Sequence, residues 1–431
     1  MHRLLIVLFF VSGCAACGPQ VPKTIGDLPM DKVALGGTPT LAYLQNALAS
    51  DKEISVAQLF VEEKIEFANA PDPSTLFAER WNTARQAPRP RIAQQLKVLT
   101  YNVGLLDRAK IFGFIDRVAV PEIEARRAVL PDAVLELGYD VVLLQEVWEL
   151  RDVDAFQTAA TKHGYRSYAG TDANHPAHGL MMLVKDAIVD ANAGEEKSET
   201  FYEVQYDLEN FPGPGLRRAY LSWRLTTTQG IALHLFDTHT TAFEDYWRVR
   251  MAQARELGLA VAAVPAEDFV IVGGDLNAAP YYDDTNWRRP DGSEFTEWWQ
   301  NAIAYPLLLF YGDLQDALVA ARPAQDVALG RLVPQNPATS AQIVYGSPGY
   351  CERTPNVVFT ATDCNSLAFR SYAGQAPPER IDYIMYRASG RAVYVASADL
   401  VFTDQRAFPE VGTFELSDHY GILSELHIEV R

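Results

Sequence analysis

The chain has 431 residues, of which 48% are hydrophobic and 21% are charged, and its formal net charge is −18. This composition excludes the disordered and fibrous classes and allows a large core. The negative charge argues against an enzyme that binds duplex DNA, because phosphate binding normally draws on Lys and Arg, although a local basic groove would be hidden in the total.

The first residues have the pattern of an export signal. Arg3 precedes an apolar run at residues 4–11, which is too short to cross a membrane as a stable helix. The following VSGC is similar to a bacterial lipoprotein box, so we expect a signal peptide over residues 1–13 and a lipid on Cys14. An ordinary secretory signal cleaved nearby is the alternative. The predicted location is the bacterial cell envelope, periplasmic or on the outer surface.

Two segments separate this signal from the main domain. Residues 14–40 are rich in Pro, Gly and Lys and are predicted to be a tether from the lipid anchor. Residues 41–91 contain helix-like stretches and end in the breaker APRPR, which predicts a helical N-terminal extension. We assign no chemistry to this extension.

From Leu96 onward, apolar strand patterns alternate with helical ones. LKVLTYNVG and DVVLLQEV read as buried strands on either side of the helix-like IEARRAVLPDAVLELG. The strands GYRSYAG, GLMMLVK, RAYLSWRL and GIALHLFDTHT follow, and the long helix DYWRVRMAQARELGLAVAAV leads to EDFVIVGGDLN. A buried helix is expected in WWQNAIAYPLLLFYGDLQDAL, and RIDYIMYR, RAVYVASADLVF and YGILSELHIEV are the closing strands. This order predicts an α/β domain over residues 95–431, with two sheets face to face and helices outside. No internal repeat is clear enough to assert.

Polar residues stand at or near the ends of these apolar runs. They are Asn102, Glu146, His239, Asp275, Asn277, Asp382, Asp418 and His419. Singly, an Asp or Asn after a strand is usually a turn residue. Together they contain the parts for metal-assisted phosphoester hydrolysis, with Glu146 as a Mg²⁺ ligand and Asp275 as the group that deprotonates water. His and amide groups can stabilise a phosphorane, and Asp382 can hold His419. Gly273 and Gly274 are expected to make room for the backbone near the phosphate.

Six motifs in one order carry a specific resemblance. TYNVG, QEV, THTTA, GGDLNAAP, RIDYI and LSDHYG resemble the endonuclease/exonuclease/phosphatase superfamily, the DNase I-like fold. The resemblance implies a four-layer α/β sandwich of two packed, mainly antiparallel sheets with helices outside. It also implies a divalent-metal phosphohydrolase that uses Mg²⁺, with Mn²⁺ or Ca²⁺ as alternatives.

The resemblance also implies a role for each residue. Asn102, Glu146 and Asp418 would lie at the metal, with Glu146 binding it directly. Asp275 would orient the attacking water, and Asn277 would hold the water or the transition state. His239 would contact the scissile phosphate, and His419, steered by Asp382, would stabilise the phosphorane or protonate the leaving group.

Several features favour a lipid substrate. FDTHTTAFEDYWRVRMAQARELG resembles the neutral sphingomyelinase-like branch, and an anchored, acidic chain suits a phospholipid such as sphingomyelin better than DNA. An exported Mg²⁺-dependent nuclease is the main alternative, followed by an inositol-phosphate phosphatase. We expect a monomer.

Four residues are candidates for substrate contact. Tyr281 and Tyr282 follow the GGDLN strand as wall residues, and Arg217 with Arg218 is either a phosphate contact or a solvated loop pair. Cys351 and Cys364 are predicted to form a local disulfide, because no neighbouring Cys or His supports a metal site.

Overall fold

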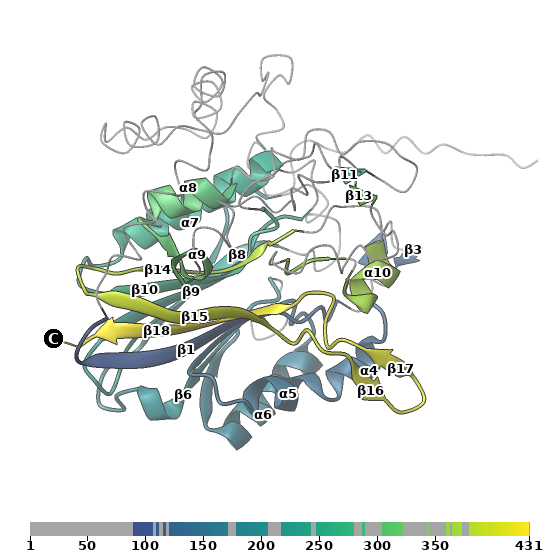
Figure 1. Cartoon of the computed structure of the whole chain (residues 1–431), viewed down its shortest axis with the longest axis horizontal. Coiled ribbons are helices and arrows are strands. Elements are labelled where there is room, and N and C mark those ends of the chain that lie inside the picture. Colours follow the sequence, from purple (N-terminus) through teal and green to yellow (C-terminus); the bar gives the residue numbers. More distant parts are fainter. Residues whose placement is uncertain are drawn as a thin grey trace, which may run out of the picture.

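The computed structural model describes the domain as two facing six-stranded sheets with helices around them (Figure 1). The described residues are 89–106, 109–111, 115–117, 120–170, 178–205, 217–242, 247–279, 287–288, 304–321, 343–344, 359–362, 364–372 and 379–430. The predicted signal peptide, the tether, residues 41–88 of the predicted extension, Cys14 and Cys351 lie outside these ranges.

Both sheets follow one plan. The first sheet has the spatial order β15 (Val393–Val401), β18 (Gly421–Glu429), β1 (Ala93–Asn102), β4 (Val141–Gln145), β6 (Met181–Lys185) and β5 (Tyr165–Tyr168). The second has the order β12 (Gln315–Asp316), β14 (Asp382–Arg387), β10 (Phe269–Asp275), β9 (Ala232–His239), β8 (Ala219–Thr226) and β7 (Glu196–Phe201). In each, the central pair is parallel and its neighbours are antiparallel.

The parallel pairs bring distant parts of the chain to the same sheet edge. Asn102 at the end of β1 pairs with Gln145 at the end of β4, and His239 at the end of β9 pairs with Asp275 at the end of β10. Parallel strands end at the same edge of a sheet, so four strand ends meet at one end of the sandwich.

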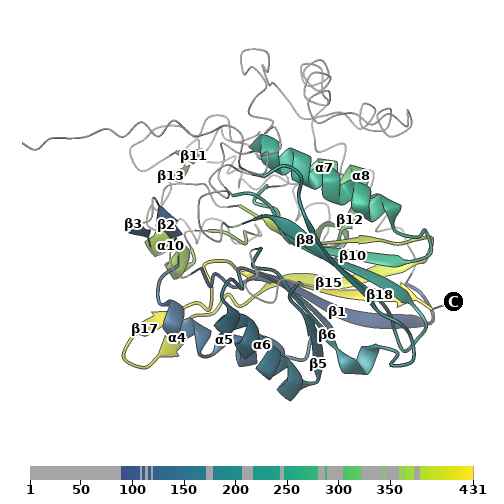
Figure 2. The ribbon, with the colours of Figure 1, turned by 180° about the vertical axis from the view of Figure 1, so that it is seen from behind.

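Helices cover the outer faces of both sheets. Figure 2 shows α4 to α6 on one side and α7 with α8 on the other. The helices are α4 (Ile123–Arg127), α5 (Leu130–Leu135), α6 (Leu150–His163), α7 (Trp247–Ala263), α8 (Ala304–Tyr311), α9 (Ala317–Ala321) and α10 (Ser366–Tyr372), with a 3₁₀ turn at Asp186–Ile188. Short strands form three further pairs: β2 (Ala109–Ile111) with β3 (Ile115–Arg117), β11 (Trp287–Arg288) with β13 (Ile343–Val344), and β16 (Arg406–Phe408) with β17 (Gly412–Phe414). Among the described residues, no helix is long and apolar enough to span a bilayer.

Side-chain alternation divides the core into three layers. On β1, Val98 packs in the cluster between the sheets, whereas its neighbour Leu99 packs in the cluster under α4 to α6. On β10, Ile271 lies between the sheets and Val272 lies against α7 and α8. Successive side chains of a strand point to opposite faces, so burial on both faces explains why these strands are apolar almost throughout.

The predicted sandwich is confirmed, with several local differences. The helix-like segment 123–138 divides into α4 and α5, because Pro131 has no N–H to continue a helix and stands in the first turn of α5. The strand β7 and the helix α6 were not foreseen. Part of the predicted buried helix is present as α8, which packs against α7. The prediction was wrong beyond Tyr311, where the helix ends and Gln315–Asp316 form the strand β12.

Candidate active site

The polar residues predicted from strand ends face the space between the two sheets. Asn102 lies on the same face of β1 as the inner residue Val98, and Asp275 lies on the same face of β10 as Ile271. The same two-residue period places His239 and Asp382 on the inner face. The structure therefore brings together side chains that are distant in the sequence, such as Asn102 and Asp275, which are 173 positions apart and in contact.

Asp275 is the centre of this group. Its Oδ2 accepts a hydrogen bond of 3.0 Å from Asn102 Nδ2 and lies 3.4 Å from His239 Nε2. Its Oδ1 accepts a 2.8 Å bond from the backbone N–H of Asn277, which has a left-handed backbone with φ of 45°. Burial, followed by the nearby charge of Asp382, raises the pKa of Asp275 to about 7.

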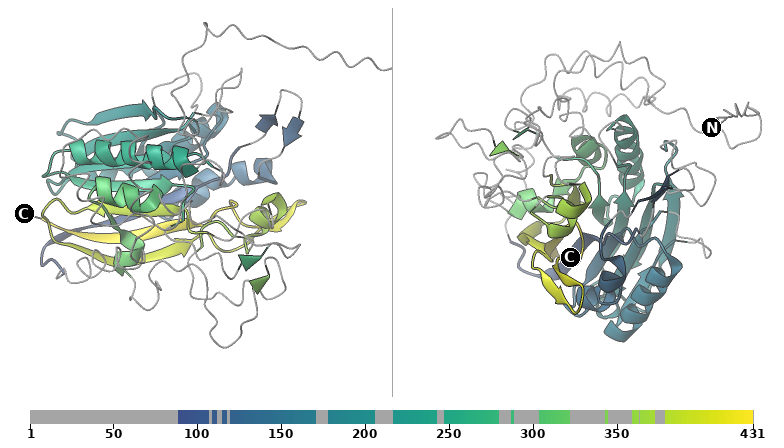
Figure 3. Two further views of the ribbon diagram at one scale, coloured as in Figure 1. Left: turned by 90° about the horizontal axis from the view of Figure 1, so that it is seen from above. Right: turned by 90° about the vertical axis from the view of Figure 1, so that its right-hand side faces the viewer.

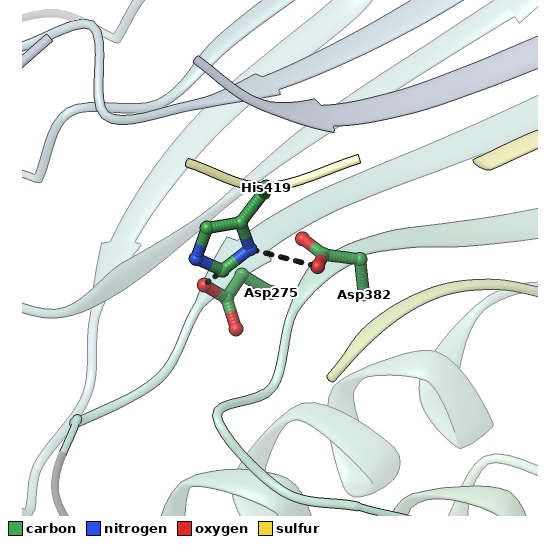
Figure 4. Close-up of side chains that lie close together, drawn as sticks. All are labelled: Asp275, Asp382 and His419. Atoms are coloured by element: carbon green, nitrogen blue, oxygen red, sulfur yellow. Dashed lines mark hydrogen bonds and ion pairs between the residues drawn. The ribbon is translucent and has the colours of Figure 1, made fainter. Parts of the chain in front are cut away.

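The two histidines of the site have opposite environments. His419 Nδ1 donates a 2.9 Å hydrogen bond to Asp382 Oδ2 and lies 4.0 Å from Asp275 Oδ2 (Figure 4). Burial alone would lower the pKa of His419, but Asp382 and other carboxylates outweigh it and raise that pKa well above its usual value. The pKa of His239 is lowered by burial and then by Arg218 and His419. These surroundings therefore favour the charged form of His419 and the neutral form of His239.

A second carboxylate pair lies on the first-sheet side. Glu146 follows β4 with a left-handed φ of 63°, an uncommon backbone for a non-glycine residue, and its Oε1 is 3.4 Å from Asn102 Nδ2. Its pKa is raised by burial and next by the charge of Asp418. A Cβ on Gly104 would lie 2.6 Å from Asp418 Oδ1, so only glycine leaves room beside this carboxylate. A divalent cation would relieve the repulsion between Glu146 and Asp418, and their oxygen donors suit Mg²⁺.

A further group can offer ligand atoms to a metal. One atom each from Asp275, Asp382 and His419 lies within 4.8 Å of the others. The Nδ1 of His419 is already bonded to Asp382, however, so this group has less free ligand capacity than Glu146 and Asp418.

Comparison with known proteins gives this arrangement its family. Residues 99–419, more than half of the chain, match the endonuclease/exonuclease/phosphatase family. The chain belongs to this family. It is accordingly a metal-dependent phosphoric ester hydrolase. No curated protein matches the sequence.

The chain is also similar to solved structures at low sequence identity. SmcL is 16% identical with a TM-score of 0.50, over 77% of this chain and 98% of SmcL. Sphingomyelinase C from Streptomyces griseocarneus is 19% identical with a TM-score of 0.47, over 77% of this chain and 99% of its own. D. rerio TDP2, complexed with a single-strand DNA product, is 16% identical with a TM-score of 0.49, over 77% of this chain and 99% of TDP2.

Several supporting residues of this phosphohydrolase were missed by the sequence reasoning. Ser417 Oγ donates to the backbone oxygen of Asn102 at 2.7 Å, and buried Arg126 donates to the carbonyls of Val103, Gly104 and Leu416. Thr360 Oγ1 accepts from the backbone N–H of Asp382 at 3.2 Å. Ser417 lies inside the quoted motif LSDHYG, whereas Arg126 and Thr360 lie outside all six motifs and gave no signal.

Glycine is required at both positions of the GGDLN strand for a reason other than the predicted one. A Cβ on Gly274 would lie 2.0 Å from the carbonyl oxygen of Thr238 on β9, and one on Gly273 would lie 2.4 Å from Leu143 of the facing sheet. The expectation that they clear space for a phosphate was wrong. They allow the neighbouring strand and the opposite sheet to approach.

The long helix after His239 supports the end of its strand. Arg250 Nη1 donates to Thr241 O at 2.9 Å, and Gln253 Oε1 accepts from Thr241 N at 2.9 Å. Gln253 Nε2 also bonds to Thr241 Oγ1 at 3.0 Å. The Arg and Gln side chains of α7 thus fix the residues that follow His239.

The two arginines predicted as candidates for substrate contact, Arg217 and Arg218, differ in burial. Arg218 is buried, with its guanidinium carbon 5.8 Å from the centre of the Trp148 ring, and its charge lowers the pKa of His239. Arg217 is exposed, with its guanidinium carbon 3.9 Å above Phe201. Trp148 was not foreseen, and its ring centre lies 6.3 Å from that of His239. Tyr281 and Tyr282 lie outside the described residues. The Cys351 to Cys364 pairing stays a prediction for the same reason.

Proposed function

We propose that the chain is a phosphodiesterase of the cell envelope that hydrolyses a phospholipid such as sphingomyelin by in-line attack of an activated water. The supporting observation is the convergence of buried Asp275 with the His419–Asp382 pair, opposite the Glu146–Asp418 carboxylates. Such a site would hold a base, a cationic acid and metal ligands close to one another.

Glu146 would bind the metal directly, with Asn102 and Asp418 beside it. The bound ion, Mg²⁺ or alternatively Mn²⁺ or Ca²⁺, would supply Lewis-acid stabilisation of the phosphoryl oxygens. Gly104 keeps space beside Asp418, because a side chain there would meet its Oδ1 at 2.6 Å. This space suits a ligand set that must stay open to a cation.

The remaining residues would act on water and phosphate. Asp275 would orient the water and accept its proton, held in place by Asn102 Nδ2 and by the backbone N–H of Asn277. Neutral His239 would contact the scissile phosphate. The imidazolium of His419 would donate to the phosphorane or to the leaving oxygen, with Asp382 fixing its Nδ1–H.

Three features support a lipid as the substrate. The net charge is −18, which opposes binding of polyanionic nucleic acid. The predicted lipoprotein signal would place the enzyme at a membrane. Phe369 on α10 and Val411 between β16 and β17 are exposed apolar side chains. The elements α10, β16 and β17 lie at the end of the molecule opposite the C-terminus (Figures 1 and 3), which is the end where β1 and β10 finish.

A parallel hydrolysis assay tests the substrate. Sphingomyelin, phosphatidylcholine, duplex DNA and an inositol phosphate would each be incubated with the purified protein in Mg²⁺ and in chelator. We expect metal-dependent release of the phosphorylated head group from lipid. Cleavage of DNA without cleavage of lipid would establish the nuclease alternative, and activity that survives chelator on any substrate would refute the metal mechanism.

The cell-envelope location is a separate proposal. Export over residues 1–13, lipidation at Cys14 and a tether over residues 14–40 would hold a monomeric enzyme at the membrane. Expression with labelled fatty acid should label the wild type and leave Cys14→Ser unlabelled. Equal labelling of both would reject Cys14 as the modified residue.

A further inference from the structure

A polar contact joins the two sheets directly beneath the site. Gln145 Nε2 donates a 2.7 Å hydrogen bond to Asp237 Oδ1, and it also lies 3.2 Å from Thr100 Oγ1. Both Gln145 on β4 and Asp237 on β9 have no exposed surface. Gln145 immediately precedes Glu146, and Asp237 stands two residues before His239.

Each partner keeps one oxygen without a hydrogen bond. Within the part of the chain that the structure describes, Gln145 Oε1 and Asp237 Oδ2 are both buried and have no donor. Both atoms are acceptors if Asp237 is ionised, so neither can satisfy the other, and an unsatisfied buried acceptor is unfavourable. A proton on Oδ2 would turn it into a donor. The acid and the amide could then form two hydrogen bonds, from Nε2 to Oδ1 and from Oδ2 to Oε1.

The surroundings of Asp237 favour the neutral form. Burial raises the pKa of Asp237 well above its usual value, and this effect outweighs Gln145 and the backbone N–H groups of Thr238, Leu144 and Met181. The four groups that oppose this shift, Gln145 and three backbone N–H groups, are all uncharged. The charge of Asp237 also contributes to the raised phenol pKa of Tyr202, for which burial is the largest cause. The site above already holds four acidic groups, and a neutral acid adds no further negative charge.

We propose that Asp237 is a protonated carboxylic acid paired with Gln145 through two hydrogen bonds, and that this pair is a positioning device for Glu146 and His239. The pair fixes the end of β4 against the end of β9 across the gap between the sheets. It thereby sets the distance from the metal ligand to the phosphate-contacting histidine. This inference rests on the proposed roles of Glu146 and His239 in phosphoester hydrolysis.

Two matched substitutions test the positioning role. Asp237→Asn keeps the shape and can make both hydrogen bonds to Gln145, so it should retain the wild-type kcat. Asp237→Leu removes both bonds and should lower kcat by about 10²-fold with a smaller change in KM, the loss expected from a displacement of about 1 Å. If Asp237→Asn loses as much kcat as Asp237→Leu, or if neither variant loses any, the positioning role is wrong.

The protonation state has its own readout, which needs no substrate. Because the folded pKa of Asp237 lies above the unfolded value, folding takes up a proton, and the wild type loses stability as pH rises above the unfolded pKa. The difference in Tm, Asp237→Asn minus wild type, should therefore become more positive as pH rises from about 5 to about 8. Asp132→Asn is the control, because hydrogen bonds from Lys162 and His163 lower the pKa of this carboxyl and no gain is expected.

Infrared spectroscopy gives a direct check on the same proteins. At pH 7 the difference spectrum of the wild type minus Asp237→Asn should show the carbonyl stretch of a protonated carboxyl group, because Asp275, with a pKa of about 7, contributes equally to both proteins. A constant difference in Tm across the pH range, or the absence of this band, would overturn the neutral acid. If these readouts appear as expected but the wild type hydrolyses no phosphodiester, the proposed function fails while the protonated pair stands.

Discussion

The two sheets have the same strand plan, yet the residues at their ends differ in chemistry. The first sheet ends in Asn102 and Glu146, which offer oxygen atoms, and the pKa of Glu146 is raised by burial and Asp418. The second sheet ends in His239 and Asp275 and begins β14 at Asp382, so it carries the groups to which we assign proton transfer in the proposed mechanism. The shared plan thus decides where the side chains meet, and the residue at each strand end decides what they do there.

His419 connects these two halves. It precedes β18 of the first sheet, but its ring bonds to Asp382 of the second sheet at 2.9 Å. A division into a metal half and a proton-transfer half therefore predicts different kinetic signatures for substitutions on the two sides. The following predictions run from the largest expected effect to the smallest.

Asp275→Asn should cause the largest loss on the proton-transfer side. The amide cannot take a proton from water, so kcat should fall by about 10²–10⁴-fold, the usual contribution of general acid–base catalysis. Metal affinity measured by calorimetry should stay near that of the wild type, because Glu146 is intact. Asp132→Asn, at an exposed carboxyl on α5, is the matched control and should keep full activity. Loss of metal binding in Asp275→Asn would contradict the division of the site into a metal half and a proton-transfer half.

Glu146→Gln should weaken the metal side instead. Because loss of even an indirect contact to a metal costs about 10–100-fold in affinity, we expect the Mg²⁺ concentration for half-maximal activity to rise by about 10²-fold. Saturating Mg²⁺ should restore part of kcat. If a metal titration of this variant matches the wild type, Glu146 is not the ligand.

Asp382→Asn sharpens the contrast between the two histidines. Burial opposes the charge of His419 and Asp382 is the largest group that favours it, so this substitution should lower the pKa of His419. The imidazolium would then be lost at lower pH, and the alkaline limb of the kcat/KM profile should move to lower pH. We expect kcat to fall by about tenfold or more, but by less than in Asp275→Asn, which removes a proton-transfer group itself. An unmoved alkaline limb would show that another group controls it.

The sequence predicted where the site residues lie better than it predicted the residues that hold them in place. Asn102, His239, Asp275 and Asp382 end or begin apolar strands, and the two-residue period puts each on the face shared with inner residues, so their meeting follows from local pattern. Glu146 breaks that period with its left-handed backbone, which no local signal predicts.

Contacts across the sandwich were beyond the reach of the sequence. The bonds of Arg126 to Leu416 O and of Gln145 to Asp237 join residues 290 and 92 positions apart, and their pairing depends on how the sheets pack. The prediction about Gly273 and Gly274 was wrong for the same reason, because the crowding at Gly274 comes from the neighbouring strand. The pattern at a strand end therefore identifies chemistry, whereas its neighbours across the gap require the fold.

The smallest predicted effect separates two adjacent arginines that the sequence could not tell apart. Arg218 is buried near Trp148, and its charge affects the pKa of both His239 and Glu146, which belong to opposite halves of the site. Arg218→Ala should raise KM about tenfold, the value of one charge-assisted hydrogen bond to phosphate of about 1.5 kcal/mol. Arg217→Ala, exposed above Phe201, should leave KM unchanged. Equal changes in the two variants would mean that a general positive charge on this loop matters, and that Arg218 holds no special place between the halves.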